Sequence, residues 1–358
     1  MRALISRLAA LVALVAPIQS VTAQDSRPDA ATYEFNDSHF HLTNYIQRGT
    51  DLRAFLGMMG ARVGHVALFG IPLQQQWSQR IDGDNGPTYY LNTDAPLYYY
   101  SFVDAAIALA YKQLTPAEQA RFDPMITGFN PTDMYATDHI RRVLRAFPGV
   151  FTGIGEFTIH KEFVSAKVAG GVASLLDPAL DSIMAFAAET GLLVIIHNDV
   201  DVPFAKPGST PAYLDQMKAM LKRHPATTII WAHTGMGRVV RPMTNHAAIL
   251  EGLLKDPALK HLNFDISWDE VAKYIVASDT SMTVAAALIN AYPDRFLFGT
   301  DVVAPEDSKQ YFRIYDLYRP FLDRLTPTAR AQLLRGNYER LFAASRKRVR
   351  AWEAAHAR

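Results

Sequence analysis

Short apolar runs of five to eight residues alternate along this chain with stretches that have the periodicity of helices. Apolar runs separated by helical patterns are typical of a parallel α/β sheet. Eight such runs make a closed (β/α)8 TIM barrel the simplest architecture, in a single domain. The runs span residues 33–39, 63–70, 122–129, 151–157, 192–197, 227–233, 262–266 and 295–300, and helical patterns cover 138–147, 177–189, 213–224, 247–255 and 326–341.

Histidine and aspartate residues stand where several of these runs end. His39 and His41 are two positions apart, so on a strand their side chains point to the same side. His197, His233 and Asp301 each follow a later run. The carboxyl ends of barrel strands meet at one face, where the chemistry of such barrels is found. A buried histidine or a helix cap explains each residue alone, but the set predicts a metal site.

These strand ends resemble those of the amidohydrolase superfamily, most closely its amidohydrolase-related branch of metal-dependent hydrolases and decarboxylases, over residues 33–342. The resemblance implies one or two divalent ions, usually zinc, held by His39, His41, His197 and Asp301. His233 would be a catalytic base, an electrophile or a ligand of a second ion. The segments that carry the resemblance are residues 37–41, 196–197, 232–235, 264–267 and 299–301.

Hydrolysis of an amide, lactone or other acyl bond of a small molecule is the expected reaction of such a site. A divalent ion lowers the pKa of a bound water from about 15.7 toward ~7. Asp301 would take the proton of that water, and His233 would polarise the scissile carbonyl. Two alternatives remain: a non-oxidative decarboxylase from the same branch, and a noncatalytic barrel that binds a metal or ligand.

The fourth run carries Glu156 where several superfamily members have a carboxylated lysine that bridges two metals. Glu156 could bridge two ions in the same way, or it could orient a histidine ligand from outside the coordination sphere. The Gly-Glu dipeptide at this position also resembles TatD-type nucleases.

Candidate substrate contacts follow the same strands. His160 is four positions after Glu156, so on a continuing strand both side chains would point to the same side. Lys161 is a possible contact for an anion, although a lysine is more often exposed. Arg238, after the sixth run, and Trp268, after the seventh, are the other candidates. A long insertion between residues 70 and 123 is rich in tyrosine, and a second covers 199–210. These long loops over the barrel mouth suggest an aromatic, anionic small molecule, and the aromatic rings could equally form a homo-oligomer contact.

The first residues read as a secretory signal peptide, with Arg2 and Arg7 before an apolar stretch and small residues up to Ala23. We therefore expect residues 1–23 to be removed, residues 24–345 to form the barrel, and 346–358 to form a basic, solvated helical tail. The mature protein would be periplasmic or secreted, without stable membrane association.

Composition narrows the chemistry further. The chain has no cysteine, which excludes disulfides and thiolate ligands and leaves histidine and carboxylates as the strong metal ligands. Its net charge is +1, and loss of Arg2 and Arg7 leaves 34 basic against 35 acidic residues. No nucleic-acid partner is expected from this balance.

Overall fold

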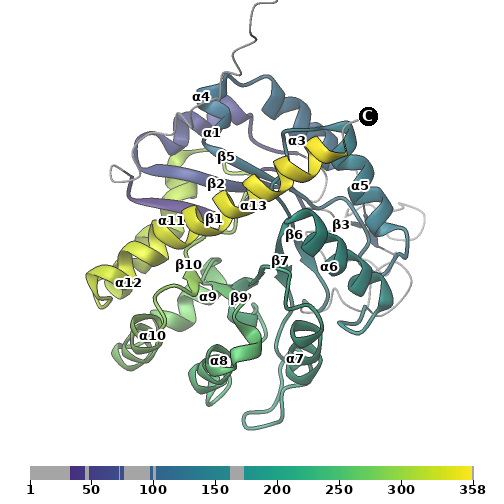
Figure 1. Cartoon of the computed structure of the whole chain (residues 1–358). Coiled ribbons are helices and arrows are strands. Elements are labelled where there is room, and N and C mark those ends of the chain that lie inside the picture. Colours follow the sequence, from purple (N-terminus) through teal and green to yellow (C-terminus); the bar gives the residue numbers. More distant parts are fainter. Residues whose placement is uncertain are drawn as a thin grey trace, which may run out of the picture.

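The computed structural model describes residues 33–44, 48–71, 73–75, 97–99, 102–161 and 173–356. A parallel sheet of nine strands in the order β10-β9-β8-β7-β6-β5-β2-β1-β11 curls into a barrel (Figure 1). Its strands are β1 (Phe35–His41), β2 (Val63–Phe69), β5 (Phe122–Ile126), β6 (Gly153–Thr158), β7 (Leu193–His197), β8 (Ile229–Trp231), β9 (Leu262–Asp265), β10 (Phe296–Leu297) and β11 (Val302–Val303).

The eighth strand position is divided between β10 and β11, and it closes the barrel. β10 pairs with β9, whereas β11 pairs with β1. Two backbone hydrogen bonds continue the closure by joining β1 to the segment between β10 and β11. Ser38 N donates to Phe298 O (3.1 Å), and Asp301 N donates to His39 O (2.7 Å). The predicted α/β barrel is therefore confirmed.

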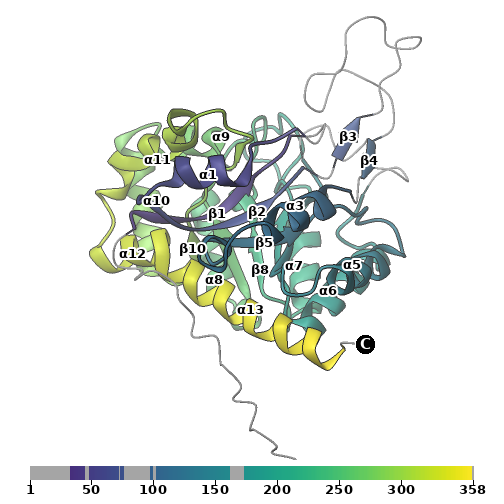
Figure 2. The same ribbon diagram turned by 90° about the horizontal axis from the view of Figure 1, so that it is seen from above.

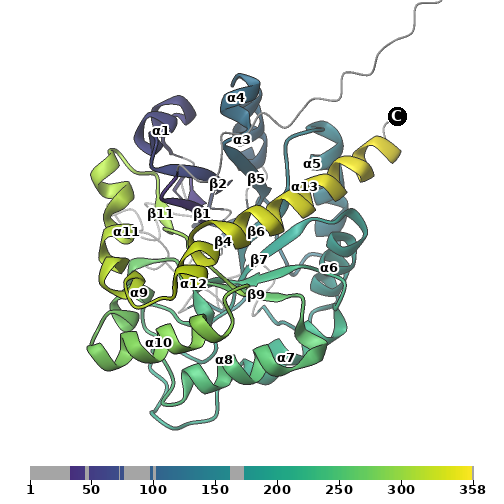
Figure 3. The ribbon, with the colours of Figure 1, turned by 60° about the vertical axis from the view of Figure 1, so that its left-hand side comes forward.

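Helices surround the sheet, as the view in Figure 3 shows. Among the described residues, no helix has the length and apolar character needed to cross a bilayer. The helices are α1 (Leu52–Met59), α3 (Phe102–Lys112), α4 (Pro116–Gln119), α5 (Ala136–Ala146), α6 (Pro178–Thr190), α7 (Leu214–Arg223), α8 (His246–Lys255), α9 (Asp269–Ile275), α10 (Asp279–Ala291), α11 (Ser308–Leu322), α12 (Pro327–Ala331) and α13 (Asn337–Ala355).

The inside of the barrel is an apolar core that α13 closes from one end (Figure 1). Tyr338, Leu341 and Phe342 of this helix belong to the same buried cluster as side chains of β2, β5, β7 and β10. The Tyr338 hydroxyl donates to Asp123 Oδ2 on β5 (2.9 Å). The end of the barrel at the amino ends of the strands is thus filled by side chains. The end at the carboxyl ends of the strands is left for the site.

The basic run expected as a solvated tail is part of α13, and three of its arginines, Arg346, Arg348 and Arg350, donate to groups of the barrel. Arg346 Nε donates to Asp123 Oδ1 (3.0 Å), and Arg350 donates to the carbonyl of Phe151. Both side chains are half-buried, while Lys347 and Arg348 are exposed. The sequence pattern did not distinguish them because a basic helix end is usually just solvated.

Other differences from the predicted elements are local. The helix expected over 326–341 is interrupted by a π-helical turn, Gln332–Gly336, between α12 and α13. The predicted signal peptide and residues 72, 76–96, 100 and 101 of the tyrosine-rich insertion lie outside the described residues. Of that insertion, β3 (Leu73–Gln75) and β4 (Leu97–Tyr99) form an antiparallel pair at the periphery of the barrel (Figure 2). The second insertion, 199–210, is irregular.

Candidate metal centre

Six side chains predicted from strand ends come together at the carboxyl end of the barrel. β1 supplies two of them, β6 and β7 supply one each, one lies in the turn after β8, and one stands directly before β11. All six side chains are at most 6% exposed. They are His39, His41, Glu156, His197, His233 and Asp301.

The first group with the geometry of a metal site joins β1 to the eighth strand position. The Nε2 atoms of His39 and His41 lie 3.3 Å and 3.0 Å from Asp301 Oδ1. Nitrogen and oxygen atoms of these three residues all lie within 4.8 Å of one another. Because His39 and His41 are two positions apart on β1, both imidazoles reach the same carboxylate oxygen of Asp301.

The second group lies on β6, β7 and the turn after β8. Glu156 Oε1 is 2.6 Å from His197 Nδ1 and 3.3 Å from His233 Nε2. The same carboxylate reaches the first group, since its oxygens lie 3.8 Å from His39 Nε2 and 3.5 Å from His41 Nε2. Glu156 thus stands between the two groups.

At the barrel mouth, several residues adopt a positive φ, which residues other than glycine rarely do. φ is +58° at His233, +53° at Asp301 and +82° at Trp268. Non-glycine residues in this region cost of order 1–3 kcal/mol each and are concentrated at functional sites. The surrounding hydrogen bonds hold these turns, including the bond from His233 N to Asp265 Oδ1 (2.9 Å).

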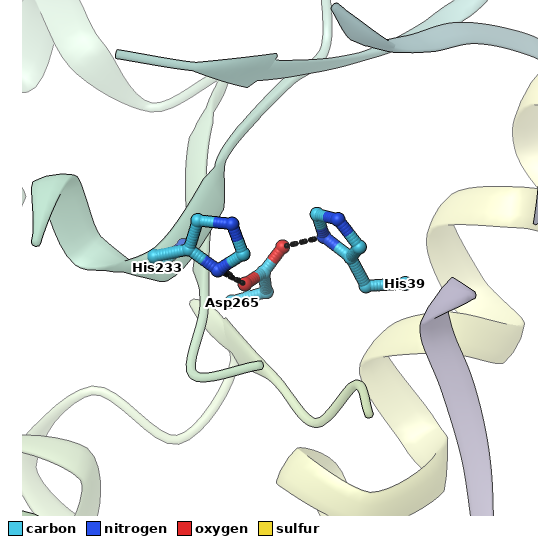
Figure 4. Close-up of side chains that lie close together, drawn as sticks. All are labelled: His39, His233 and Asp265. Carbon is cyan, nitrogen blue, oxygen red and sulfur yellow. Dashed lines mark hydrogen bonds and ion pairs between the residues drawn. The ribbon is translucent and has the colours of Figure 1, made fainter. Parts of the chain in front are cut away.

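Asp265, at the end of β9, connects the two groups from behind (Figure 4). Its Oδ2 accepts from His39 Nδ1 (3.0 Å), which leaves the Nε2 atom of that ring facing the centre. Its Oδ1 accepts from Ser267 Oγ (2.5 Å), and Ser267 Oγ is 3.0 Å from His233 Nδ1. A carboxylate that receives the outer N–H of a ligand histidine fixes the ring and its tautomer.

His197 and His41 are held in the same manner. His197 Nε2 donates to Asp199 Oδ1 (3.1 Å), and His41 Nδ1 donates to the carbonyl of Gly70 (3.2 Å). The sequence prediction did not assign Asp265 or Asp199 to the site. The position of Asp265 at the end of the seventh run was the available signal for it.

Opposite charges at close range shift the protonation of the site. Burial alone would raise the pKa of Asp301, but His39, His41 and His233 hold that pKa well below its usual range. Burial disfavours the charged form of His39, yet Asp301 and Asp265 raise the pKa of this imidazole well above its usual value. For His233, burial dominates and the pKa is lowered. The centre therefore combines ionised carboxylates with one imidazole, His39, that favours the protonated form and another, His233, that favours the neutral form.

These residues fit a divalent cation. Among the described residues, the buried Nε2 atoms of His39 and His233 have no hydrogen-bond partner, although both lie beside carboxylates at the centre. A metal ion supplies such atoms with a partner, and imidazole with carboxylate is a donor set for zinc and other first-row divalent ions. The negative potential that keeps a proton on His39 equally attracts a cation.

The four predicted substrate contacts are placed differently from one another. Lys161 is 2% exposed, in contrast to the exposed position that lysine usually takes, and its Nζ lies 5.1 Å from the Trp268 ring centroid. Arg238 is half-exposed and lies 5.8 Å from the same centroid. His160 stacks on Tyr213, with ring centroids 3.6 Å apart.

A family model described as Amidohydrolase matches residues 37–343, which is most of the chain. This match confirms the resemblance inferred from the strand ends, whose residues it includes. No curated protein matches the chain at a significant level.

Solved structures share the fold at low sequence identity. A putative 2-pyrone-4,6-dicarboxylic acid hydrolase from Pseudomonas putida is 13% identical, covers 87% of this chain and 98% of its own, and has a TM-score of 0.53. An amidohydrolase from Burkholderia multivorans with bound zinc is 15% identical, with coverages of 86% and 99% and a TM-score of 0.53. An uncharacterised TIM-barrel protein from Bordetella bronchiseptica is 16% identical, with coverages of 87% and 99% and a TM-score of 0.52.

Proposed function

Because this chain belongs to the amidohydrolase family, we propose that it is a metal-dependent hydrolase that cleaves an acyl bond, such as an amide or a lactone, in a small molecule. The observation that carries this proposal is the group of six buried histidine and carboxylate side chains at the carboxyl end of the barrel. Zinc is our first choice of metal, since the donor set suits it and the Burkholderia multivorans structure contains it.

We infer that two ions bind, with Glu156 between them. His39, His41 and Asp301 would hold one ion, and His197 and His233 the other. The inference rests on the distances from Glu156 to both groups, which range from 2.6 to 3.8 Å. A carboxylate has two oxygens and can serve both ions, as a carboxylated lysine would.

A bound divalent ion would supply Lewis acidity and a water of lowered pKa. The ionised carboxylate of Asp301 would accept the proton of the attacking water and later deliver it to the leaving group. His233, whose lowered pKa favours the neutral ring, would hold the second ion through the lone pair of its Nε2. Burial of all these groups excludes bulk solvent and strengthens their electrostatic effect.

Replacement of His39 and His41 by alanine tests the metal centre. Elemental analysis of the purified double variant should show loss of stoichiometric metal, because these imidazoles are two of the three side chains of the first group. His224→Ala is the matched control, since His224 pairs with Asp181 on the outside of the barrel. Full metal occupancy in the double variant would contradict the assignment.

Glu156→Gln tests the number of ions. The amide retains the shape of the side chain but lacks the charge needed to serve two cations, so occupancy should fall from two ions to one. A wild-type protein that never holds more than one tightly bound ion would instead place Glu156 behind a ligand histidine.

The type of reaction is tested by product chemistry in oxygen-labelled water. The metal-loaded protein is offered lactones, acylated amino acids and aromatic carboxylates, and the release of acid and of carbon dioxide is followed separately. Hydrolysis places the label in the product acid. Release of carbon dioxide without label in the remaining product would show a decarboxylase and refute the proposed hydrolysis.

A further inference from the structure

An apolar cavity lies between α8, α9 and α10, apart from the candidate metal centre. α10 packs against both other helices on one side of the barrel (Figure 3). The cavity has a volume of about 530 Å³, within the range of pockets that hold small molecules. Its lining includes Ile266 and Phe296, which belong to the buried cluster shared with the surrounding helices and not to the barrel interior. The described residues that line it include none of the six clustered side chains, so the cavity is distinct from the metal centre.

The lining of this cavity is largely apolar. Its described residues include no lysine, arginine, aspartate or glutamate. A charged ligand would lose its hydration there without a counter-ion, whereas an apolar ligand gains affinity from the surface that it buries. The large hydrophobic side chains of the lining include Met236, Met243, Leu250, Ile275, Val284 and Leu288. The cavity therefore suits neutral, largely apolar molecules.

His246, the first residue of α8, contributes an imidazole to the lining. The residue is 9% exposed, and among the described residues neither ring nitrogen has a partner with the geometry of a hydrogen bond. Burial lowers the pKa of His246 to about 4, although the backbone of Thr234 acts in the opposite direction. The ring is therefore neutral at pH 7 and offers one N–H donor and one acceptor nitrogen. A hydroxyl group of a bound molecule would satisfy this buried ring, which is unfavourable without a partner.

The shape of the cavity favours a small molecule over a protein partner. Of the large hydrophobic side chains described in its lining, only Val284 is exposed, whereas Leu250, Ile275 and Phe296 are buried. A surface that docks another protein presents a contiguous exposed apolar patch. A recessed apolar space with few polar groups is instead typical of a site that encloses a small ligand.

We propose that this cavity binds a neutral, largely apolar small molecule whose hydroxyl group forms a hydrogen bond with His246. A compound with two fused rings and one hydroxyl group has this chemistry. The site goes beyond the proposed function, because no metal ion takes part in it. Its ligand would contact Thr234, the residue after His233, so this site and the candidate metal centre share one short turn of backbone.

1-Naphthol and 1-methylnaphthalene are the probes, because a hydroxyl group in one replaces a methyl group of similar size in the other. Equilibrium dialysis with the zinc-loaded protein should show that 1-naphthol binds more tightly. In His246→Leu the ratio of the two dissociation constants should shift at least about fivefold toward 1-methylnaphthalene, since the hydroxyl then has no partner. Val284→Trp should weaken both probes at least about tenfold, because the indole fills the cavity. Leu109→Trp is the matched control, since Leu109 is similarly exposed on α3 and does not line the cavity.

Other sites for the probes give different results. The proposal is refuted if neither probe binds the wild type, if the ratio is unchanged in His246→Leu, or if both probes bind Val284→Trp as they bind the wild type. The His39 and His41 double variant should retain binding of 1-naphthol, and its loss there would place the probe at the metal centre instead. A wild type that sediments as a dimer, with Val284→Trp as a monomer, would show that a second copy covers the cavity and would overturn the proposal.

Discussion

Asp265 holds the two halves of the candidate metal centre in register. One of its oxygens binds the outer nitrogen of His39, and the other receives the backbone N–H of His233 and the hydroxyl of Ser267. The carboxylate is completely buried and its pKa is lowered, because His39 and His233 outweigh the effect of burial. A single side chain therefore sets the orientation of one histidine from each group.

Asp265→Ala should lower the affinity for zinc about 10- to 100-fold, the usual effect of removing the partner of a ligand histidine. Competition with a chelator of known affinity measures it. Asp256→Ala is the control, because Asp256 caps a short helix at the opposite face of the barrel. Equal zinc affinity in both variants would show that Asp265 does not position the ligands.

The sequence placed the six clustered side chains correctly at one end of the barrel, because the position of a residue on a strand determines where its side chain lies. The same reasoning gave no means to see that Lys161 is buried, since that depends on Trp268, which is more than 100 positions later in the chain. It also missed Asp199, which meets His197 through a turn rather than through strand periodicity.

At the scale of elements, the apolar runs predicted the strands well but not the way two of them end. β8 stops at Trp231, and a short 3-10 turn carries His233, because Asp265 draws the backbone N–H of His233 out of the strand. The eighth run similarly breaks between β10 and β11 at Asp301. Hydrogen bonds to residues distant in the sequence determine both breaks. The pattern of apolar residues cannot predict such bonds.

Asp104 attaches α3 to the end of β5, and it should make stability depend on pH. It accepts from the backbone N–H groups of Thr127 and Gly128 (both 2.9 Å), and burial raises its pKa from 3.8 to about 7. The folded state therefore binds a proton more tightly than the unfolded state, so stability is lost as pH rises from about 4 to about 7. The loss is at most about 4 kcal/mol, from ~1.4 kcal/mol per pKa unit.

Urea unfolding of wild type and Asp104→Asn at pH 4.5 and pH 8 measures this effect. The difference in the free energy of unfolding between the two proteins should shift in favour of the variant at the higher pH, because asparagine carries no charge to bury. A difference that is the same at both pH values would mean that Asp104 keeps an ordinary pKa.

For the whole molecule, a bound metal should stabilise the folded state, because it joins side chains from several strands of the barrel. The six side chains come from both ends of the sequence, so an ion that binds the folded chain stabilises it by mass action, by ~4 kcal/mol at 1,000 times its Kd. Removal of metal with a chelator should lower the thermal midpoint, on the order of 5 °C. The His39 and His41 double variant should show little further change with the chelator. An equal fall in that variant would point to a different metal site.

The predicted signal peptide concerns the whole chain as well. Intact mass of the exported protein should correspond to a start at Gln24, since small residues precede the expected cut after Ala23. A purified exported protein that retained residues 1–23 would contradict the prediction.

The position of α13 has a consequence for biosynthesis. The ribosome makes this helix after all the other described elements, yet it closes the end of the barrel with Tyr338, Leu341 and Phe342. A nascent chain that already contains residues 39–301 still exposes the apolar interior until α13 emerges. Truncated products that end before Asn337 would therefore carry every residue of the metal centre and yet be prone to aggregation and degradation.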